Sequence, residues 1–300
     1  MSSRFTIYPN LLSITDSFNG ILLGAYGVFW GGNAKGPLKN SQETMKELVN
    51  SGKIVGILSN TTQLAQSEIK KLHKIGIVQN QHFHFLVTSG EITKEILKKG
   101  ALPFPITHNK YWVLGRSHPK FSSHTLLFAG SHFTETDNIN EADFIYVSIP
   151  HKNGKDQINP ELFKLDVEKL CYSYLPMVCP NPDQFAHEGN PPKSVVRQGS
   201  LAKFYEELGG NVFYVGKPSS EAYAFAMRQF NTYDLHDPKE ILMVGDTPET
   251  DIRGARCFGM KSALVTQTGM MGDKVQSLGF EQTIRNFPHT DFPDFFIEKF

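Results

Sequence analysis

The chain has 300 residues, of which 40% are apolar, 20% charged and 12% aromatic, a composition typical of a folded globular protein and unlike that of a disordered one. Its 30 basic residues equal its 30 acidic residues in number, so the net charge near zero gives no long-range attraction to nucleic acid or to an anionic membrane. The three cysteines lack CxxC spacing, which argues against a disulfide framework or a zinc site. We find no signal segment, and no apolar run approaches the roughly 18 residues that a membrane span needs. We therefore expect a cytoplasmic protein.

Apolar runs alternate with helical patterns in the first part of the chain. Ile21–Leu23 predicts a buried strand that ends in a glycine-rich turn. Residues 40–50 predict a helix, with Ser41 as its N-cap. Residues 53–58 predict the next strand, and a second amphipathic helix follows with apolar side chains at helical spacing over residues 64–72.

The same alternation returns in the last third of the chain. Strands are predicted at Val212–Val215, Ile241–Val244 and Ser262–Val265, and a helix over about Ser220–Phe230. Strands that alternate with helices predict an α/β fold with a doubly wound parallel sheet. Ligands in such sheets bind outside the carboxyl ends of the strands, and polar residues follow several of the predicted strands: Ser59-Asn60, Lys217-Pro218 and Asp246-Thr247.

The segment between these two parts has a different register and predicts a separate, smaller α/β domain. Tyr111–Gly115 and Phe144–Val147 predict its strands, and turn-forming residues flank it. We therefore expect a core domain of residues 1–87 and 186–300, and an inserted cap domain of residues 88–185. Gly189–Lys193 predicts a proline-rich surface loop.

Four polar residues are candidates for chemistry, each with a purely structural alternative. Asp246 and Asp251 could bring two carboxylates to one hard cation, or could be two helix caps. Lys217, at a strand end, could bind a phosphate or be a solvated lysine in a loop. Ser59 could donate a hydrogen bond to a phosphate oxygen or be an N-cap. Four cap-region histidines could contact a ligand or solvent, namely His118, His124, His132 and His151.

In order and spacing these segments resemble the haloacid dehalogenase superfamily, in the class IIA branch of sugar-phosphate and 4-nitrophenyl phosphate phosphatases. The resemblance runs from about Ile21 to Gly269 and rests on Gly27-Val28, Trp30-Gly31-Gly32, Ser59-Asn60, Thr88-Ser89-Gly90, Asn181-Pro182-Asp183, Gly216-Lys217-Pro218, Gly245–Ala255 and Thr268-Gly269. It implies a Rossmann-like core with an inserted C2-type α/β cap, and a homodimer formed through the cap.

The same resemblance implies roles for individual residues. Ser59 and Asn60 would bind phosphate, and Lys217 would neutralise charge on the phosphate. Asp246 would bind Mg²⁺ and Asp251 would support the metal.

The chain departs from the superfamily at the residues that perform the reaction. There, the first Asp of an Asp-x-Asp-Gly motif attacks phosphorus and the second protonates the leaving group, whereas this chain has Gly24 and Tyr26. Glycine can neither form an aspartyl-phosphate nor donate a carboxylate to Mg²⁺, so the resemblance implies a weakened metal site. Asp16 heads a similar motif, but it precedes the strand and belongs at the opposite edge of the sheet.

These observations leave the enzymatic status of the chain open between two main interpretations. In the first, the chain is a pseudoenzyme that binds a phosphorylated small molecule or a protein partner through Ser59, Asn60 and Lys217. In the second, it is an active Mg²⁺-dependent phosphomonoesterase for sugar phosphates with a non-standard nucleophile, such as a metal-activated water. A third is an interaction protein that uses the cap surface.

Overall fold

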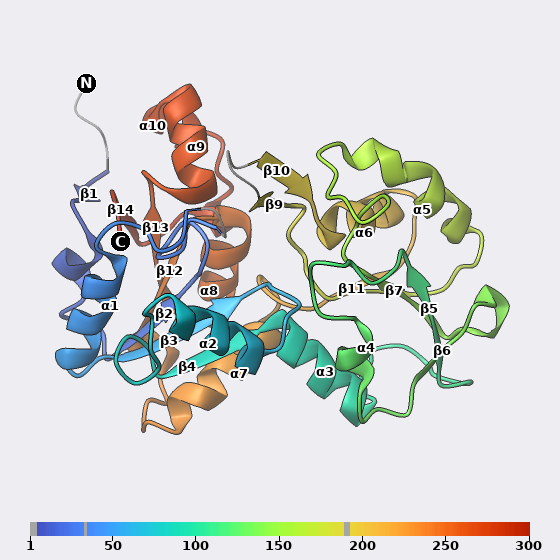
Figure 1. Cartoon of the computed structure of the whole chain (residues 1–300). Helices are drawn as coiled ribbons and strands as arrows, with labels where there is room; N and C mark the ends of the chain where they lie inside the picture. The colour runs from blue at the N-terminus through green and yellow to red at the C-terminus, as the bar shows by residue number, and fades with distance from the viewer. Residues whose placement is uncertain (1–4, 33–34, 189–192) are drawn as a thin grey trace. The chain divides into compact units, whose positions relative to one another are not determined.

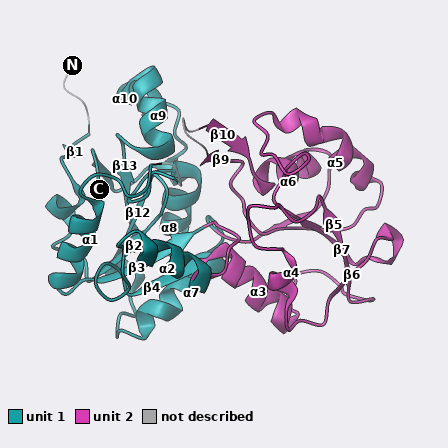
Figure 2. Cartoon of the chain, viewed as in Figure 1, with its two compact units in different colours: residues 1–59, 66–87, 217–300 teal, residues 60–65, 88–216 magenta. Residues whose placement is uncertain are grey.

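A computed structural model of the chain describes residues 5–32, 35–188 and 193–300. These residues form two compact units, one of residues 1–59, 66–87 and 217–300 and one of residues 60–65 and 88–216 (Figures 1 and 2). None of the helices in the described part of the chain combines the length and the apolar character that a membrane crossing requires.

The larger unit is built on a seven-stranded sheet in the order β1-β14-β13-β12-β2-β3-β4 (Figure 1). The pairings from β1 through to β3 are parallel. The strands are β1 (Ile7–Tyr8), β2 (Gly20–Leu23), β3 (Ile54–Ser59), β4 (Phe85–Thr88), β12 (Ile241–Gly245), β13 (Lys261–Val265) and β14 (Phe295–Ile297). All four residues of β2 and all five of β12 are buried, as expected for central strands that are covered on both faces.

Helices pack on this sheet through their apolar side chains. They are α1 (Ser41–Asn50), α2 (Ala65–Lys74), α7 (Ser220–Asn231), α8 (Arg253–Phe258), α9 (Gly269–Leu278) and α10 (Phe280–Ile284). Short helical turns lie at Leu11–Ile14, Pro238–Glu240, Pro248–Ile252 and His289–Asp291. Met45 and Leu48 of α1, for example, belong to the same buried cluster as Val55 of β3 and Val244 of β12.

The smaller unit has its own parallel sheet, in the order β11-β8-β7-β5-β6. Its strands are β5 (Lys110–Leu114), β6 (Thr134–Glu135), β7 (Phe144–Val147), β8 (Met177–Cys179) and β11 (Val212–Tyr214), and β9 (Phe185–Glu188) and β10 (Lys193–Val196) form an antiparallel pair. The helices are α3 (Ser89–Lys99), α4 (Thr125–Phe128), α5 (Lys164–Cys171) and α6 (Gln198–Glu207), with short turns at Ile139–Glu141 and Pro160–Phe163.

The structure confirms the α/β class and its parallel sheets, and it corrects two details. The predicted Val212–Val215 strand is β11, which pairs with β8 in the smaller sheet, so the second unit ends at residue 216 and not at 185. A short apolar run does not show which sheet it joins, and this explains the error. Lys193 begins β10, and the rest of the loop predicted at 189–193 lies outside the described residues.

The predicted cap of the first helix was also wrong. Ser41 is the first residue of α1, and the N-cap is Asn40, whose side chain makes no capping hydrogen bond. The Ser41 hydroxyl instead donates to the carbonyl oxygen of Leu38 at 2.7 Å. Sequence alone could not separate these two neighbouring positions, because both Asn and Ser are favoured N-cap residues.

Candidate functional site

Gly24 directly follows β2, whose neighbours in the sheet are β12 and β3. Its N–H donates to the carbonyl of Val244 at 2.8 Å, which continues the pairing with β12. A Cβ added at Gly24 would lie 3.4 Å from the Val28 side chain and 3.5 Å from Asp251 Oδ1. These are ordinary contacts, so the position has room for a Cβ next to the Asp251 carboxylate.

Asp251 is held in a buried ion pair. Lys217 Nζ donates to Asp251 Oδ1 at 2.6 Å, and the two side chains are 8% and 2% exposed. The other oxygen, Oδ2, accepts hydrogen bonds from the backbone N–H groups of Asp246 at 3.2 Å and Thr247 at 3.1 Å. Asp251 lies in the π-helical turn Pro248–Ile252, and its carboxylate bonds back to the end of β12, so the alternative of a helix cap was wrong for this residue.

Asp246 follows β12 and is buried between two glycine backbones. Its Oδ2 accepts from the N–H of Met270 at 2.8 Å, so it caps the first turn of α9. Gly27 and Gly269 have left-handed backbones with φ of +72° and +65°, and a Cβ on either would overlap the Asp246 carboxyl group. The hydroxyl of Thr268 donates to the carbonyl of Gly27 and joins the two glycine segments.

Burial and the nearby Asp251 raise the pKa of Asp246 to about 7, although the Met270 N–H and Lys217 act in the opposite direction. The carboxyl group therefore carries less than a full negative charge near neutral pH.

Tyr26 lies in the loop after β2 and is half-buried. Burial, together with the charges of Asp246 and Asp273, raises the pKa of its phenol well above the usual value. The phenol therefore stays protonated at neutral pH, and a protonated phenol is a weak nucleophile.

Ser59 and Asn60 follow β3 but have different surroundings. Ser59 ends β3, and the parallel pairing of Leu23 with Ile57 places it at the same sheet edge as the end of β2. Asn60 is buried in the smaller unit, where its Nδ2 donates to Asp183 Oδ1 at 2.8 Å and its carbonyl accepts from Ser89 Oγ at 2.8 Å. These bonds give Asn60 a structural role in holding the Asn-Pro-Asp segment.

The available donors do not fit a magnesium site. Within the described residues, no group of three or more His, Cys, Asp or Glu side chains could hold a metal ion. Asp251 is bonded to Lys217, Asp246 is bonded to the start of α9, and Gly24 contributes no oxygen from a side chain. Mg²⁺ is usually bound through one or two carboxylates and several waters, and here both candidate carboxylates are already bonded within the protein.

The structure thus brings Gly24, Lys217, Asp246 and Asp251 together at one sheet edge. The enclosure of Asp246 by Gly27, Gly269 and Met270 was not predicted, although Gly27 and Gly269 both belong to segments of the resemblance. A glycine in a sequence does not reveal whether it permits a left-handed backbone or a close approach.

Comparisons with known sequences find similar proteins. Residues 214–284 match the model of a family described as HAD-hydrolase-like. The chain is 28% identical over 252 residues to the sugar-phosphatase AraL of Bacillus subtilis, across 82% of each protein. It is 44% identical over 89 residues to a cardiolipin synthase (CMP-forming)/mitochondrial hydrolase fusion protein of Schizosaccharomyces pombe, a match that spans only 15% of that protein.

A solved structure shares the fold over nearly the whole chain. It is that of a haloacid dehalogenase-like hydrolase from Brucella suis, with a TM-score of 0.78 and 18% identity, and the match covers 98% of this chain and 99% of the other.

Proposed function

We propose, from the premise that the chain belongs to the haloacid dehalogenase-like superfamily, that it is a phosphatase-family protein that binds a phosphorylated ligand without nucleophilic catalysis. The observation that carries this proposal is Gly24 at the end of the central strand β2. The position lies beside the Lys217–Asp251 ion pair and has room for a Cβ, but glycine supplies no nucleophilic atom. In other hydrolases, the loss of a nucleophile lowers the rate by on the order of 10⁶.

The ligand in this proposal is a phosphorylated small molecule or protein segment. Lys217 supplies the positive charge and Ser59, at the same sheet edge, supplies a hydroxyl. The partial neutralisation of Asp246 supports anion binding, because an ionised carboxylate here would repel phosphate. A metal does not enter the proposal, because the donor set does not fit one.

A second candidate function is sugar-phosphate hydrolysis, and the observation in its favour is the 28% identity to the AraL sugar-phosphatase over 82% of both proteins. This activity would require a nucleophile other than residue 24, such as a water molecule. Lys217, Asp246 and Asp251 would then stabilise the charge that develops on phosphate.

Two measurements on the full chain separate these functions. The first is release of phosphate from 4-nitrophenyl phosphate and a panel of sugar phosphates, with and without Mg²⁺. The second is binding of inorganic phosphate by calorimetry, with the Ser59→Ala variant and, as a matched control, Ser51→Ala, whose hydroxyl bonds to Leu48 at the end of α1. We expect no turnover, and phosphate binding that S59A weakens and S51A does not. Turnover by the natural chain, lost in Asp246→Asn, would establish the second function and contradict the first.

A further inference from the structure

Three side chains of the smaller unit form a continuous hydrogen-bonded chain, which we call the serine relay: Ser117, His124 and Glu135. Ser117 Oγ lies 3.0 Å from His124 Nδ1, and His124 Nε2 lies 2.9 Å from Glu135 Oε2. Ser117 follows β5, His124 precedes α4 and Glu135 ends β6. The strands β5 and β6 are parallel neighbours, and Glu135 pairs with Tyr111, the second residue of β5.

The hydrogen bonds of the relay run in the direction that activates a hydroxyl: Ser117 donates to His124, and His124 donates to Glu135. An ionised carboxylate can only accept, so the hydrogen bond to Glu135 places the proton of His124 on Nε2. Nδ1 then carries a lone pair and accepts from the Ser117 hydroxyl. Behind Ser117, the Ser123 hydroxyl lies 2.9 Å away and itself accepts from Thr125 Oγ1 at 2.9 Å. The direction of donation is therefore consistent along the whole chain.

The imidazole of His124 is fixed by its surroundings. Its side chain is 9% exposed, and its ring packs against those of Tyr111, Phe128 and Tyr146 at centroid distances of 6.4, 6.4 and 5.8 Å. Such packing limits the rotamers of His124 and holds Nδ1 towards Ser117.

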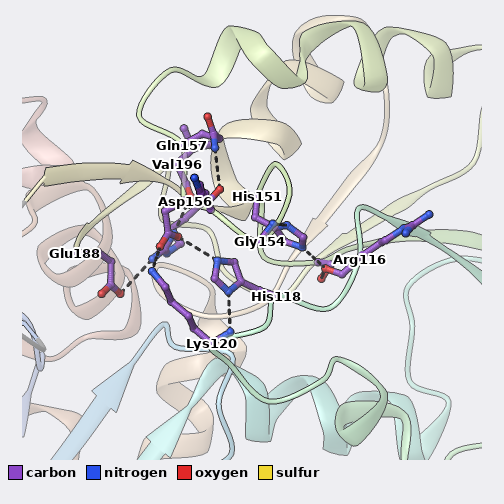
Figure 3. Close-up of polar contacts among 12 residues, drawn as sticks. Arg116, His118, Lys120, His151, Gly154, Asp156, Gln157, Glu188 and Val196 are labelled. Carbon is purple, nitrogen blue, oxygen red and sulfur yellow. Dashed lines mark hydrogen bonds and ion pairs between the residues drawn. The ribbon is translucent and has the colours of Figure 1, made fainter.

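The residues on either side of Ser117 are anchored, as Figure 3 shows for Arg116 and His118. The Arg116 carbonyl accepts from Ser148 Oγ at 2.8 Å and lies 3.3 Å from His151 Nε2. The buried His118 ring accepts from the N–H of Lys120 at 3.1 Å and faces Asp156 at 3.5 Å. Ser117 is therefore an exposed residue on a rigidly supported backbone, and its hydroxyl remains accessible to a substrate.

A pocket adjoins the relay. Ser117 and His124 line it together with Leu127, Tyr146 and Gln198; its enclosed space is only about 10 Å³, so a ligand would lie largely at its open mouth. Gln198 is 1% exposed, and its Oε1 has no hydrogen-bond partner among the described residues. The described residues that line the pocket are mostly polar and include no Asp, Glu, Lys or Arg, so together with the unpaired amide they suit a small, uncharged polar group better than a charged one.

We infer that Ser117 is a nucleophile for short-chain carboxylic esters, with His124 as its general base and Glu135 as a positioning residue. Ser117 Oγ attacks the acyl carbon as its proton moves to His124 Nδ1, and the alcohol leaves with that proton. Water then attacks the acyl-serine, gives a proton to Nδ1 and releases the carboxylic acid as the proton returns to Ser117 Oγ. The site is independent of the phosphate site proposed in the larger unit.

The first test is covalent labelling of the full chain with a fluorophosphonate probe, followed by peptide mass spectrometry. We expect one adduct on Ser117, absent in Ser117→Ala and retained in Ser277→Ala, a control at an exposed serine of α9 that does not line the pocket. Absence of an adduct on the natural chain, or an equal yield in S117A, overturns the inference.

The second test is hydrolysis of 4-nitrophenyl acetate. His124→Gln should lower the rate by about 10²- to 10⁴-fold, the usual contribution of a general base. Glu135→Gln should lower kcat and leave KM unchanged, because Glu135 orients the base and does not touch the ester. Thermal melts of each variant test for loss of fold. A folded H124Q or E135Q variant with the natural kcat would refute the assigned roles.

Discussion

Substitution of Gly24 by Asp tests whether the end of β2 is the position of a missing nucleophile. The Cβ of the new residue fits there, because its contacts to Val28 and to the Val244 carbonyl would be 3.4 Å. The backbone is not left-handed, so the substitution introduces no conformational strain. The effect of Gly24→Asp should therefore be electrostatic and not steric.

The expected loss of folding stability in Gly24→Asp follows from the charges around residue 24. The new carboxylate would lie near Asp251, whose Oδ1 is 3.5 Å from the Cβ position, and Lys217 and Asp246 are close to the same group. Two unit charges about 4 Å apart interact by about 4 kcal/mol at an effective dielectric constant of about 20. Asp251 and Asp246 repel the new carboxylate and Lys217 attracts it; the repulsion by Asp246 is the weaker one because the pKa of Asp246 is near 7. The sum is a destabilisation of the folded chain by about 2 to 4 kcal/mol.

Thermal melts with and without MgCl₂, together with 4-nitrophenyl phosphate turnover, measure the result. Without Mg²⁺, G24D should melt roughly 5 to 15 °C below the natural chain. Because its new carboxylate completes an oxygen donor set, Mg²⁺ should recover most of this loss and turnover should appear. Gly24→Asn, the neutral isostere, should show neither response. If the G24D melt ignores Mg²⁺ and no phosphate is released, the assignment of position 24 is wrong.

Three further predictions concern the same group of residues. The pKa of Asp246 rises on folding from 3.8 to about 7, so the folded chain binds the proton more tightly and stability falls as the pH rises through this window; Asp246→Asn should flatten that part of a urea-melt pH series. Lys217→Met leaves a buried aspartate without its ion-pair partner and should cost about 3 to 5 kcal/mol in urea unfolding, whereas the exposed Lys261→Met should cost less than about 1 kcal/mol. Gly27→Ala should cost about 1 to 3 kcal/mol because its Cβ overlaps a carboxyl group, and Gly24→Ala should be neutral or gain about 0.5 kcal/mol. Equal melting midpoints within either pair, or an unchanged pH profile in D246N, would contradict the packing described for this site.

The local pattern predicted much of the fold because both sheets are buried. Continuous apolar runs such as Ile241–Val244 and Phe144–Val147 have few alternatives to central strands, and both lie in strands with those bounds or one residue more. The partner of a strand is a non-local property, and for that reason Val212–Tyr214 was assigned to the wrong sheet. The resemblance to a family indicated the order of the motifs along the chain, but it did not show which strands pair through hydrogen bonds.

For the candidate site too, local features could be predicted from the sequence, whereas contacts between distant residues could not. The spacing of Asp246 and Asp251 predicted two carboxylates directed at one cation; what the structure adds is that the backbone N–H of Asp246 donates to the Asp251 carboxylate. The sequence could not show that Asp251 is the partner of Lys217, because 34 residues separate them. Likewise, no local motif joins Ser117 to Glu135, since β5 and β6 become neighbours only in the folded sheet.

The pairing of β1 with β14 has a consequence for synthesis on the ribosome. Ile7 pairs with Phe296, and β2 has β12 as one of its two neighbours, so the larger sheet needs strands from both ends of the sequence. Residues 88–216 of the smaller unit are translated in between, and the wait between β2 and β12 is roughly 10 to 45 s at about 5–20 residues per second. During that interval the apolar Ile21–Leu23 strand has one open edge, which makes the nascent chain a natural client for chaperones that bind exposed strands.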